Sequence, residues 1–186
     1  ALWGSHSEGS LLRRSGARPG DKIAVTGSLG DAAGGLAVMK GESRPSAEAN
    51  AYLRKAHLRP RPRVSEGQAL ARLGVRAAID ISDGLVADLG HICEASGVSA
   101  TIDVDRLPLS PQLREAFGDR ARELALFGGE DYELLFTDPG SLMDAAERAL
   151  ACPVTVIGEI GSAVPGKVTL ADRDGHVLPW ARGGWD

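Results

Sequence analysis

The order of apolar and polar residues in this chain predicts an α+β fold in which helices cover a mixed β-sheet. Short apolar segments bounded by glycine, typical of strands, alternate with segments whose apolar residues recur at helical spacing. Residues 98–104, VSATIDV, alternate apolar and polar side chains without exception, which indicates a strand with one buried and one polar face. Residues 167–179, KVTLADRDGHVLP, contain the pair Asp174-Gly175, which favours a closing hairpin and a sheet that is not all parallel.

The first predicted strand is DKIAVTG, residues 21–27, and a glycine-rich turn connects it to a helix within SLGDAAGGLAVM, residues 28–39. Such a junction can bind an anion on free helix N–H groups. It is not a Walker A loop, because the Gly-Lys-Ser/Thr ending is absent. We favour the alternative that Gly34 and Gly35 let the helix pack closely on the sheet.

Two further helices are expected before the next strand. Residues 43–58, SRPSAEANAYLRKAHL, have helical spacing of apolar residues. Residues 65–74, SEGQALARLG, offer a capping box at Ser65 and Gln68 and a terminating Gly74.

The strand RAAIDI, residues 76–81, precedes a helix within GLVADLGHICEASG, residues 84–97, which ends at Gly97. Its apolar face includes Cys93, and we place His91 at the surface. A proline-interrupted loop and one short helix follow. The chain then continues as a glycine turn into a strand, a helix and a buried strand, in residues 126–137, 141–151 and 154–160.

Composition limits the classes of function. The 186 residues are 43% hydrophobic and 25% charged, as in a soluble chain of one domain or one domain plus an extension. The net charge of −4 and the pI of about 5.6 argue against a nucleic-acid partner. The most basic stretch, residues 53–63, is broken by prolines; we interpret it as a helix end and a loop, with anion binding as a minor alternative.

Other partners and compartments are also limited. No apolar run approaches membrane-spanning length, so no membrane contact is expected. Cys93 and Cys152 lie far apart outside any CxxC pattern, which predicts neither a disulfide framework nor a zinc site. We expect a cytoplasmic location.

Two acidic turns carry the candidate chemistry. In AIDISDGL, residues 78–85, Ser82 or Asp83 could cap the helix that follows, but capping leaves Asp80 unexplained. The competing hypothesis is a magnesium–phosphate site at the end of a strand, because magnesium binds carboxylate oxygens and substrate phosphates. The residues alone favour neither hypothesis over the other.

The second acidic turn is GGEDYELLF, residues 128–136. Its two glycines let the backbone approach another group closely, and Glu130 and Asp131 lie just before the next strand. A merely solvated acidic turn is the alternative.

Taken together, five segments resemble the thiamine-monophosphate kinase family, which belongs to the aminoimidazole ribonucleotide synthetase superfamily. DISDGL alone would indicate only the superfamily, and its combination with GGEDYEL indicates the kinase. The resemblance covers the chain from about Leu11 to Asp186. Its segments are SGARPGDKIAVTGSLGDAAGGLA, HLRPRPRV, AIDISDGLVADLGHI, LFGGEDYELLFT and GGWD.

The resemblance implies a three-layer α/β/α fold with a mixed central sheet and a partly ferredoxin-like topology. Residues 21–186 would form the C-terminal synthetase-like domain, and residues 1–20 an extension or linker from an ATP-binding domain that has no counterpart in this sequence. The complete enzyme would be a homodimer.

The resemblance also implies ATP-dependent phosphorylation of thiamine monophosphate to thiamine diphosphate with magnesium. By position, Asp80 and Asp83 would bind Mg²⁺ and Ser82 the nucleotide, while Glu130 and Trp185 would bind thiamine monophosphate. No residue is assigned as a catalytic acid or base, and Gly128, Gly129 and Asp131 are given supporting roles. The alternatives are another ATP-dependent synthetase of the superfamily and a non-catalytic ligand-binding or assembly module.

Overall fold

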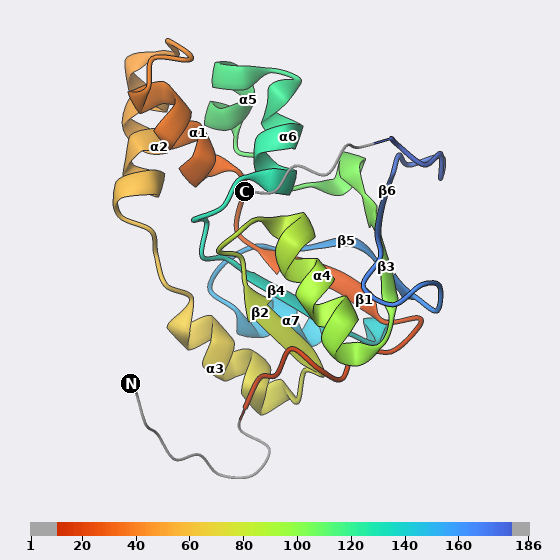
Figure 1. Ribbon diagram of the computed structural model, residues 1–186. Helices are drawn as coiled ribbons and strands as arrows, with labels where there is room; N and C mark the ends of the chain where they lie inside the picture. Colours follow the sequence, from red (N-terminus) through yellow and green to blue (C-terminus); the bar gives the residue numbers. More distant parts are fainter. Residues whose placement is uncertain (1–10, 180–186) are drawn as a thin grey trace, which may run out of the picture.

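A computed structural model describes residues 11–179, which form an α+β fold around one six-stranded sheet (Figure 1). The strand order is β2-β4-β1-β5-β3-β6. Neighbouring strands are antiparallel except β3 and β6, which are parallel, so the sheet is mixed as predicted. The strands are β1 Lys22–Thr26, β2 Ala77–Asp80, β3 Ser99–Asp103, β4 Leu134–Asp138, β5 Val154–Gly161 and β6 Val168–Ala171.

Seven α-helices lie in the described part of the chain. They are α1 Asp31–Met39, α2 Ala47–Leu58, α3 Val64–Leu73, α4 Leu85–Ser96, α5 Pro111–Phe117, α6 Arg120–Phe127 and α7 Met143–Ala149. Where one short helix was expected there are two, α5 and α6, because Gly118 adopts a positive φ of 53° between them.

Helices cover both faces of the sheet, which gives the three layers. On one face α4 buries Leu85, Leu89 and Ile92 in the largest apolar cluster of the described residues. On the other face α3 and α7 pack against Phe136 of β4. Figure 1 shows α4 in front of the sheet and α7 behind it.

The topology contains two split βαβ units, β2–α4–β3 and β4–α7–β5. The strands of each unit are parallel to each other, and at least one strand of the sheet lies between them. Split βαβ units are the feature shared with ferredoxin-like folds.

The remaining helices, α1, α2, α5 and α6, gather beyond one end of the sheet (Figure 1). The prediction that Gly34 and Gly35 pack on the sheet is wrong, because both face neighbouring helices. A Cβ at Gly35 would lie 2.1 Å from the carbonyl oxygen of Leu53 in α2, and one at Gly34 would lie 2.5 Å from Leu113 in α5. The two glycines therefore allow close approach of helices, not of a helix and a sheet.

At α3, the predicted capping box is wrong and the predicted terminating glycine is confirmed. The helix begins at Val64 and has no side-chain cap, so Ser65 and Gln68 form no capping box. The Ser65 hydroxyl instead donates to Glu66 Oε2 at 2.8 Å. Gly74 ends the helix with a φ of 77° as predicted, and Gly97 ends α4 in the same way.

The last described segment turns back at Asp174-Gly175, and Ala171 pairs with Val177 in one antiparallel bridge, which agrees with the predicted hairpin. Among residues 11–179, no helix combines the length and the apolar character needed to cross a bilayer.

Candidate functional site

The strand register brings the two acidic turns together. In the antiparallel pair of β2 and β4, Asp80 lies opposite Leu134. The turn that follows β2 and the turn that precedes β4 therefore meet at the same end of the sheet.

Backbone hydrogen bonds join these turns directly. The N–H of Glu130 donates to the carbonyl of Ser82, and the N–H of Tyr132 to that of Ile81, each at 2.9 Å. A Cβ at Gly129 would lie 2.3 Å from the Ser82 oxygen, so only glycine permits this approach. The expectation that the glycines allow close backbone approach is confirmed.

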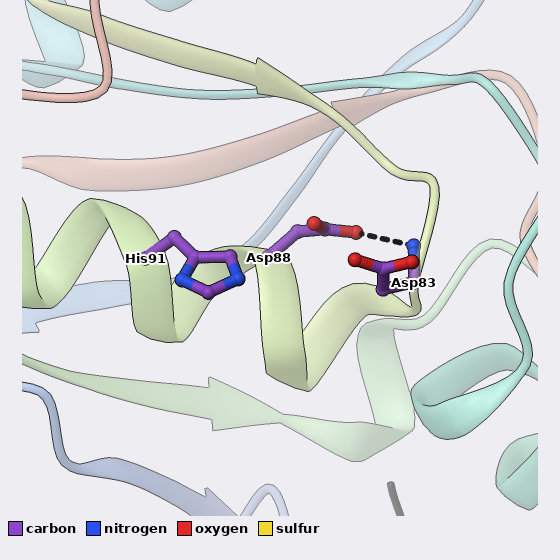
Figure 2. Close-up of side chains that lie close together, drawn as sticks. All are labelled: Asp83, Asp88 and His91. Atoms are coloured by element: carbon purple, nitrogen blue, oxygen red, sulfur yellow. Dashed lines mark hydrogen bonds between the residues drawn. The ribbon is translucent and has the colours of Figure 1, made fainter. Parts of the chain in front are cut away.

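Asp88 organises the first acidic turn. This buried residue accepts the N–H groups of Ser82, Asp83 and Gly84 on Oδ2, at 2.9, 3.1 and 3.2 Å (Figure 2 shows the bond to Asp83). Burial raises the pKa of Asp88, and these N–H groups oppose the increase. The sequence interpretation missed Asp88, although an acid inside the apolar helical segment LVADL was a signal for it.

This arrangement rules out the capping alternative for the first turn. Helix α4 has Gly84 at its N-cap position and no side-chain cap, so neither Ser82 nor Asp83 serves that purpose. Asp80 and Asp83 are exposed, and neither carboxylate has a hydrogen bond or ion pair with any residue in 11–179. Both carboxylates are therefore accessible to a cation.

Carboxylates of both turns raise the pKa of one hydroxyl group, that of Tyr132. Tyr132 donates its hydroxyl to Glu130 Oε2 at 3.1 Å. The pKa of Tyr132 is raised, first by this hydrogen bond and the charge of Glu130, then by desolvation and the charges of Asp80 and Asp83. Three of the predicted site residues thus share one acidic neighbourhood.

One group of three possible metal ligands lies at this end of the sheet, and it differs from the predicted pair. Asp83, Asp88 and His91 each place one ligand atom within 4.8 Å of the others (Figure 2), and Asp80 is not in this set. His91 is exposed and lies 3.8 Å from Glu94, in agreement with its predicted surface position. A second set, far along the chain at the hairpin, consists of Asp172, Asp174 and His176.

A cleft of about 1050 Å³ extends from the acidic turns between α1 and α6. Ser82, Asp83 and Glu130 line its acidic part. Its apolar lining comes mainly from the two helices, with one residue of α4, and includes Ala33, Leu36, Ala37, Ala87, Leu124 and Phe127. The cleft therefore offers an apolar wall next to several carboxylates, a combination that suits an organic cation, and the basic side chains of Lys40 and Arg120 also line it.

The basic stretch before α3 has a structural partner. Arg63 binds Glu133 through two hydrogen bonds, Nε to Oε2 and Nη2 to Oε1, both at 2.7 Å. The Thr26 hydroxyl donates to the same carboxylate at 2.5 Å. This ion pair fixes the loop, residues 59–63, to β1 and β4, in agreement with the interpretation as a helix end followed by a loop. Trp185 lies outside the described residues.

Comparison with known proteins decides the family. The C-terminal domain family of AIR synthase related proteins matches residues 18–170. The thiamine-monophosphate kinase of Salmonella typhimurium is 46% identical over 183 residues, which cover 96% of this chain and 55% of the relative. That of Escherichia coli K12 is 45% identical over 177 residues, 92% of this chain and 54% of the relative.

The chain belongs to the thiamine-monophosphate kinase family. It spans about half the length of the curated relatives that it matches.

Solved structures agree with this family and with the predicted fold. The thiamine-monophosphate kinase of Stenotrophomonas maltophilia K279a superposes with a TM-score of 0.82 at 42% identity, covering 93% of this chain and 56% of that one. The structure of AaThiL complexed with AMPPCP and TMP gives 0.75 at 36% identity, with coverages of 94% and 53%. The hydrogenase maturation protein HypE, at 19% identity and a TM-score of 0.64, shows a shared fold alone.

Proposed function

We propose that this chain is the C-terminal half of a thiamine-monophosphate kinase, which transfers the γ-phosphoryl group of ATP to the phosphate of thiamine monophosphate. The observation that carries the proposal is the meeting of two acidic turns beside an apolar cleft, with Asp80, Asp83 and Glu130 around the Tyr132 hydroxyl. The kinship with AaThiL, complexed with AMPPCP and TMP, supports it.

The reaction suits residues that position and neutralise charge. An oxygen of the thiamine monophosphate phosphate bonds to the γ-phosphorus, and the bond to the β–γ bridging oxygen breaks, so ADP leaves with the electron pair. Because the attacking oxygen is already anionic, the step needs no strong general base. This agrees with a site to which no catalytic acid or base is assigned.

The residues of the first turn fit a magnesium ion. The exposed carboxylates of Asp80 and Asp83 are hard oxygen ligands, and the Asp88 hydrogen bonds hold the turn that carries Asp83 in place. A bound ion would reduce the repulsion between the two polyphosphate groups. Asp80 and Asp83 would hold this ion, and Ser82 would contact the nucleotide.

The cleft fits the rest of the substrate. Its apolar walls between α1 and α6 would contact the two rings of thiamine monophosphate. Glu130 would face the aminopyrimidine amino group or the thiazolium charge, and Trp185 would supply an aromatic face. The reaction would take place in the cytoplasm, where ATP is available.

The test uses this chain joined to the N-terminal half of a relative such as the Salmonella enzyme, hereafter the joined enzyme. We expect it to release ADP with thiamine monophosphate as the acceptor, to form thiamine diphosphate, to need Mg²⁺ and to elute as a dimer in size-exclusion chromatography. ADP release with other acceptors but not with thiamine monophosphate would instead indicate a related synthetase. Ligand binding without ADP release for any acceptor would indicate a non-catalytic module.

A further inference from the structure

The Asp131 carboxylate connects the second acidic turn to the beginning of α1. Its Oδ2 accepts the Gly30 N–H at 2.7 Å, and its Oδ1 accepts the Ala32 N–H at 3.1 Å. Each oxygen thus binds an N–H group that the first turn of a helix leaves without an intrahelical partner. An asparagine could not repeat this arrangement, because one end of its amide is a donor.

The backbone on either side of Asp131 is held in an uncommon conformation. Glu130 and Tyr132 have positive φ angles of 72° and 51°, and they are the only non-glycine residues with positive φ in the described chain. The N–H groups of both donate to the first acidic turn. The backbone of residues 130–132 therefore faces one neighbour, the first acidic turn, while the Asp131 side chain binds another, α1.

The packing around this connection leaves no room for further side chains. A Cβ at Gly128 would lie 2.4 Å from Ala33 Cβ of α1, and one at Gly30 would lie 2.7 Å from the Ala125 nitrogen of α6. Ala33 and Glu130 both line the cleft. Any change in the contact between α1 and the second turn therefore changes the relative position of an apolar wall and Glu130.

We propose that Asp131 is a positioning residue: by binding the first N–H groups of α1, it sets the place of Glu130 relative to the apolar wall of the cleft. The inference rests on the proposed function and assigns Asp131 a part in thiamine monophosphate binding. The nucleotide side has its own anchor, because Asp88 holds the amides of residues 82–84. Loss of Asp131 thus acts on one side of the site.

The test compares Asp131→Asn with the wild-type 186-residue chain. The matched control is Asp103→Asn, which also removes a carboxylate that accepts a backbone N–H, that of Asp105 at 3.0 Å, away from the cleft. Amide hydrogen exchange is followed by NMR, and binding of thiamine monophosphate is measured with Mg²⁺ by calorimetry.

In Asp131→Asn we expect the Glu130 and Tyr132 amides to exchange about tenfold faster. Binding of thiamine monophosphate should weaken about fivefold or more. The amides of residues 82–84 should keep their rates, and the control should change neither measurement. This split distinguishes positioning from a general loss of stability, which would speed exchange at both turns.

A folded Asp131→Asn chain with unchanged Glu130 exchange, or with wild-type affinity for thiamine monophosphate, overturns the inference. If the variant does not fold, hydrogen exchange of the wild-type chain provides the test. The four amides that take part in this connection should share one opening free energy, and clearly different values overturn the inference. These amides are those of Gly30, Ala32, Glu130 and Tyr132. If the wild-type chain alone binds no thiamine monophosphate, binding is measured in the joined enzyme. Shared opening of the four amides without binding there would support the connection and contradict the proposed function.

Discussion

At the scale of single residues, the buried Asp88 supplies the acceptor that the N–H groups before α4 need. It binds three of them with one oxygen, so the neighbouring acids are not used for capping. Asp80 and Asp83 stay exposed, with no hydrogen bond or ion pair to another described residue. One buried carboxylate thus leaves two exposed carboxylates available for binding.

Asp80→Asn should abolish most activity of the joined enzyme and leave stability nearly unchanged. The side chain is exposed and lies near other acids, so its neutralisation should change the unfolding free energy by no more than about 0.5 kcal/mol. Urea unfolding and ADP release measure the two effects. A destabilised Asp80→Asn variant with full activity would show that Asp80 is structural.

The unfolding free energy of the chain should carry a pH dependence that comes from Asp131. Burial raises its pKa to about 7, against about 3.9 in the unfolded chain. Between these values the folded state keeps a proton that the unfolded state has released. The contribution of Asp131 to the unfolding free energy is therefore largest below about pH 4 and is lost as the pH rises through about 7.

Asp131→Asn removes this group, so the stability difference between wild type and variant should fall from about pH 4 to about pH 7 and then level off. Urea unfolding over this range provides the measurement, and Asp103→Asn is again the control. A pH-independent difference between wild type and Asp131→Asn would argue against the raised pKa.

Substrate recognition should depend on Glu130 and Trp185. In the joined enzyme, Glu130→Gln and Trp185→Ala should raise the KM for thiamine monophosphate and leave the KM for ATP nearly unchanged. An indole face over a cation contributes about 0.5–2 kcal/mol. Steady-state kinetics with each substrate varied in turn is the measurement. Equal changes for both substrates would assign these two residues a structural role.

At the scale of elements, close packing of α1 on α2 shapes the helical end of the molecule that carries the cleft. Gly35→Ala would place a Cβ 2.1 Å from the Leu53 carbonyl and should destabilise the chain by about 1–3 kcal/mol. The matched control is Gly90→Ala in α4, where nothing lies within 4 Å of the added Cβ. This control should stabilise by about 0.5–1 kcal/mol. Urea midpoints compare the two variants, and equal effects would contradict the close-packing explanation.

The register of the strands brings the two acidic turns together. Because β2 and β4 are antiparallel with Asp80 opposite Leu134, two acidic segments about 50 residues apart in sequence become neighbours. The ion pair of Arg63 with Glu133 then fixes the loop before α3 beside them. The elements therefore place the candidate site, and the turns between them supply its carboxylates.

At the scale of the whole molecule, the length of the chain matters most. It corresponds to about half of the kinases that it resembles, yet both faces of its sheet are covered by helices. We therefore expect the 186-residue chain to unfold cooperatively in urea and to release no ADP from ATP with thiamine monophosphate and Mg²⁺. The joined enzyme is the positive control. Robust turnover by the chain alone would show that this half is sufficient.

The sequence by itself determined the local features of this protein. Its apolar spacing located most helices and strands, its glycines located the ends of α3 and α4, and its motifs identified the family. These features depend on residues close in the chain, and periodicity and helix termination act at that range.

Only the tertiary structure decided how these elements meet. It showed that Gly34 and Gly35 face helices, that Asp88 anchors the first acidic turn, and that Asp131 binds α1. These contacts join residues whose proximity depends on strand register and helix packing. A carboxylate also has the same local signature whether it caps a helix, holds a turn or stays exposed. Its role is set by which unpaired N–H groups the fold brings within hydrogen-bonding distance.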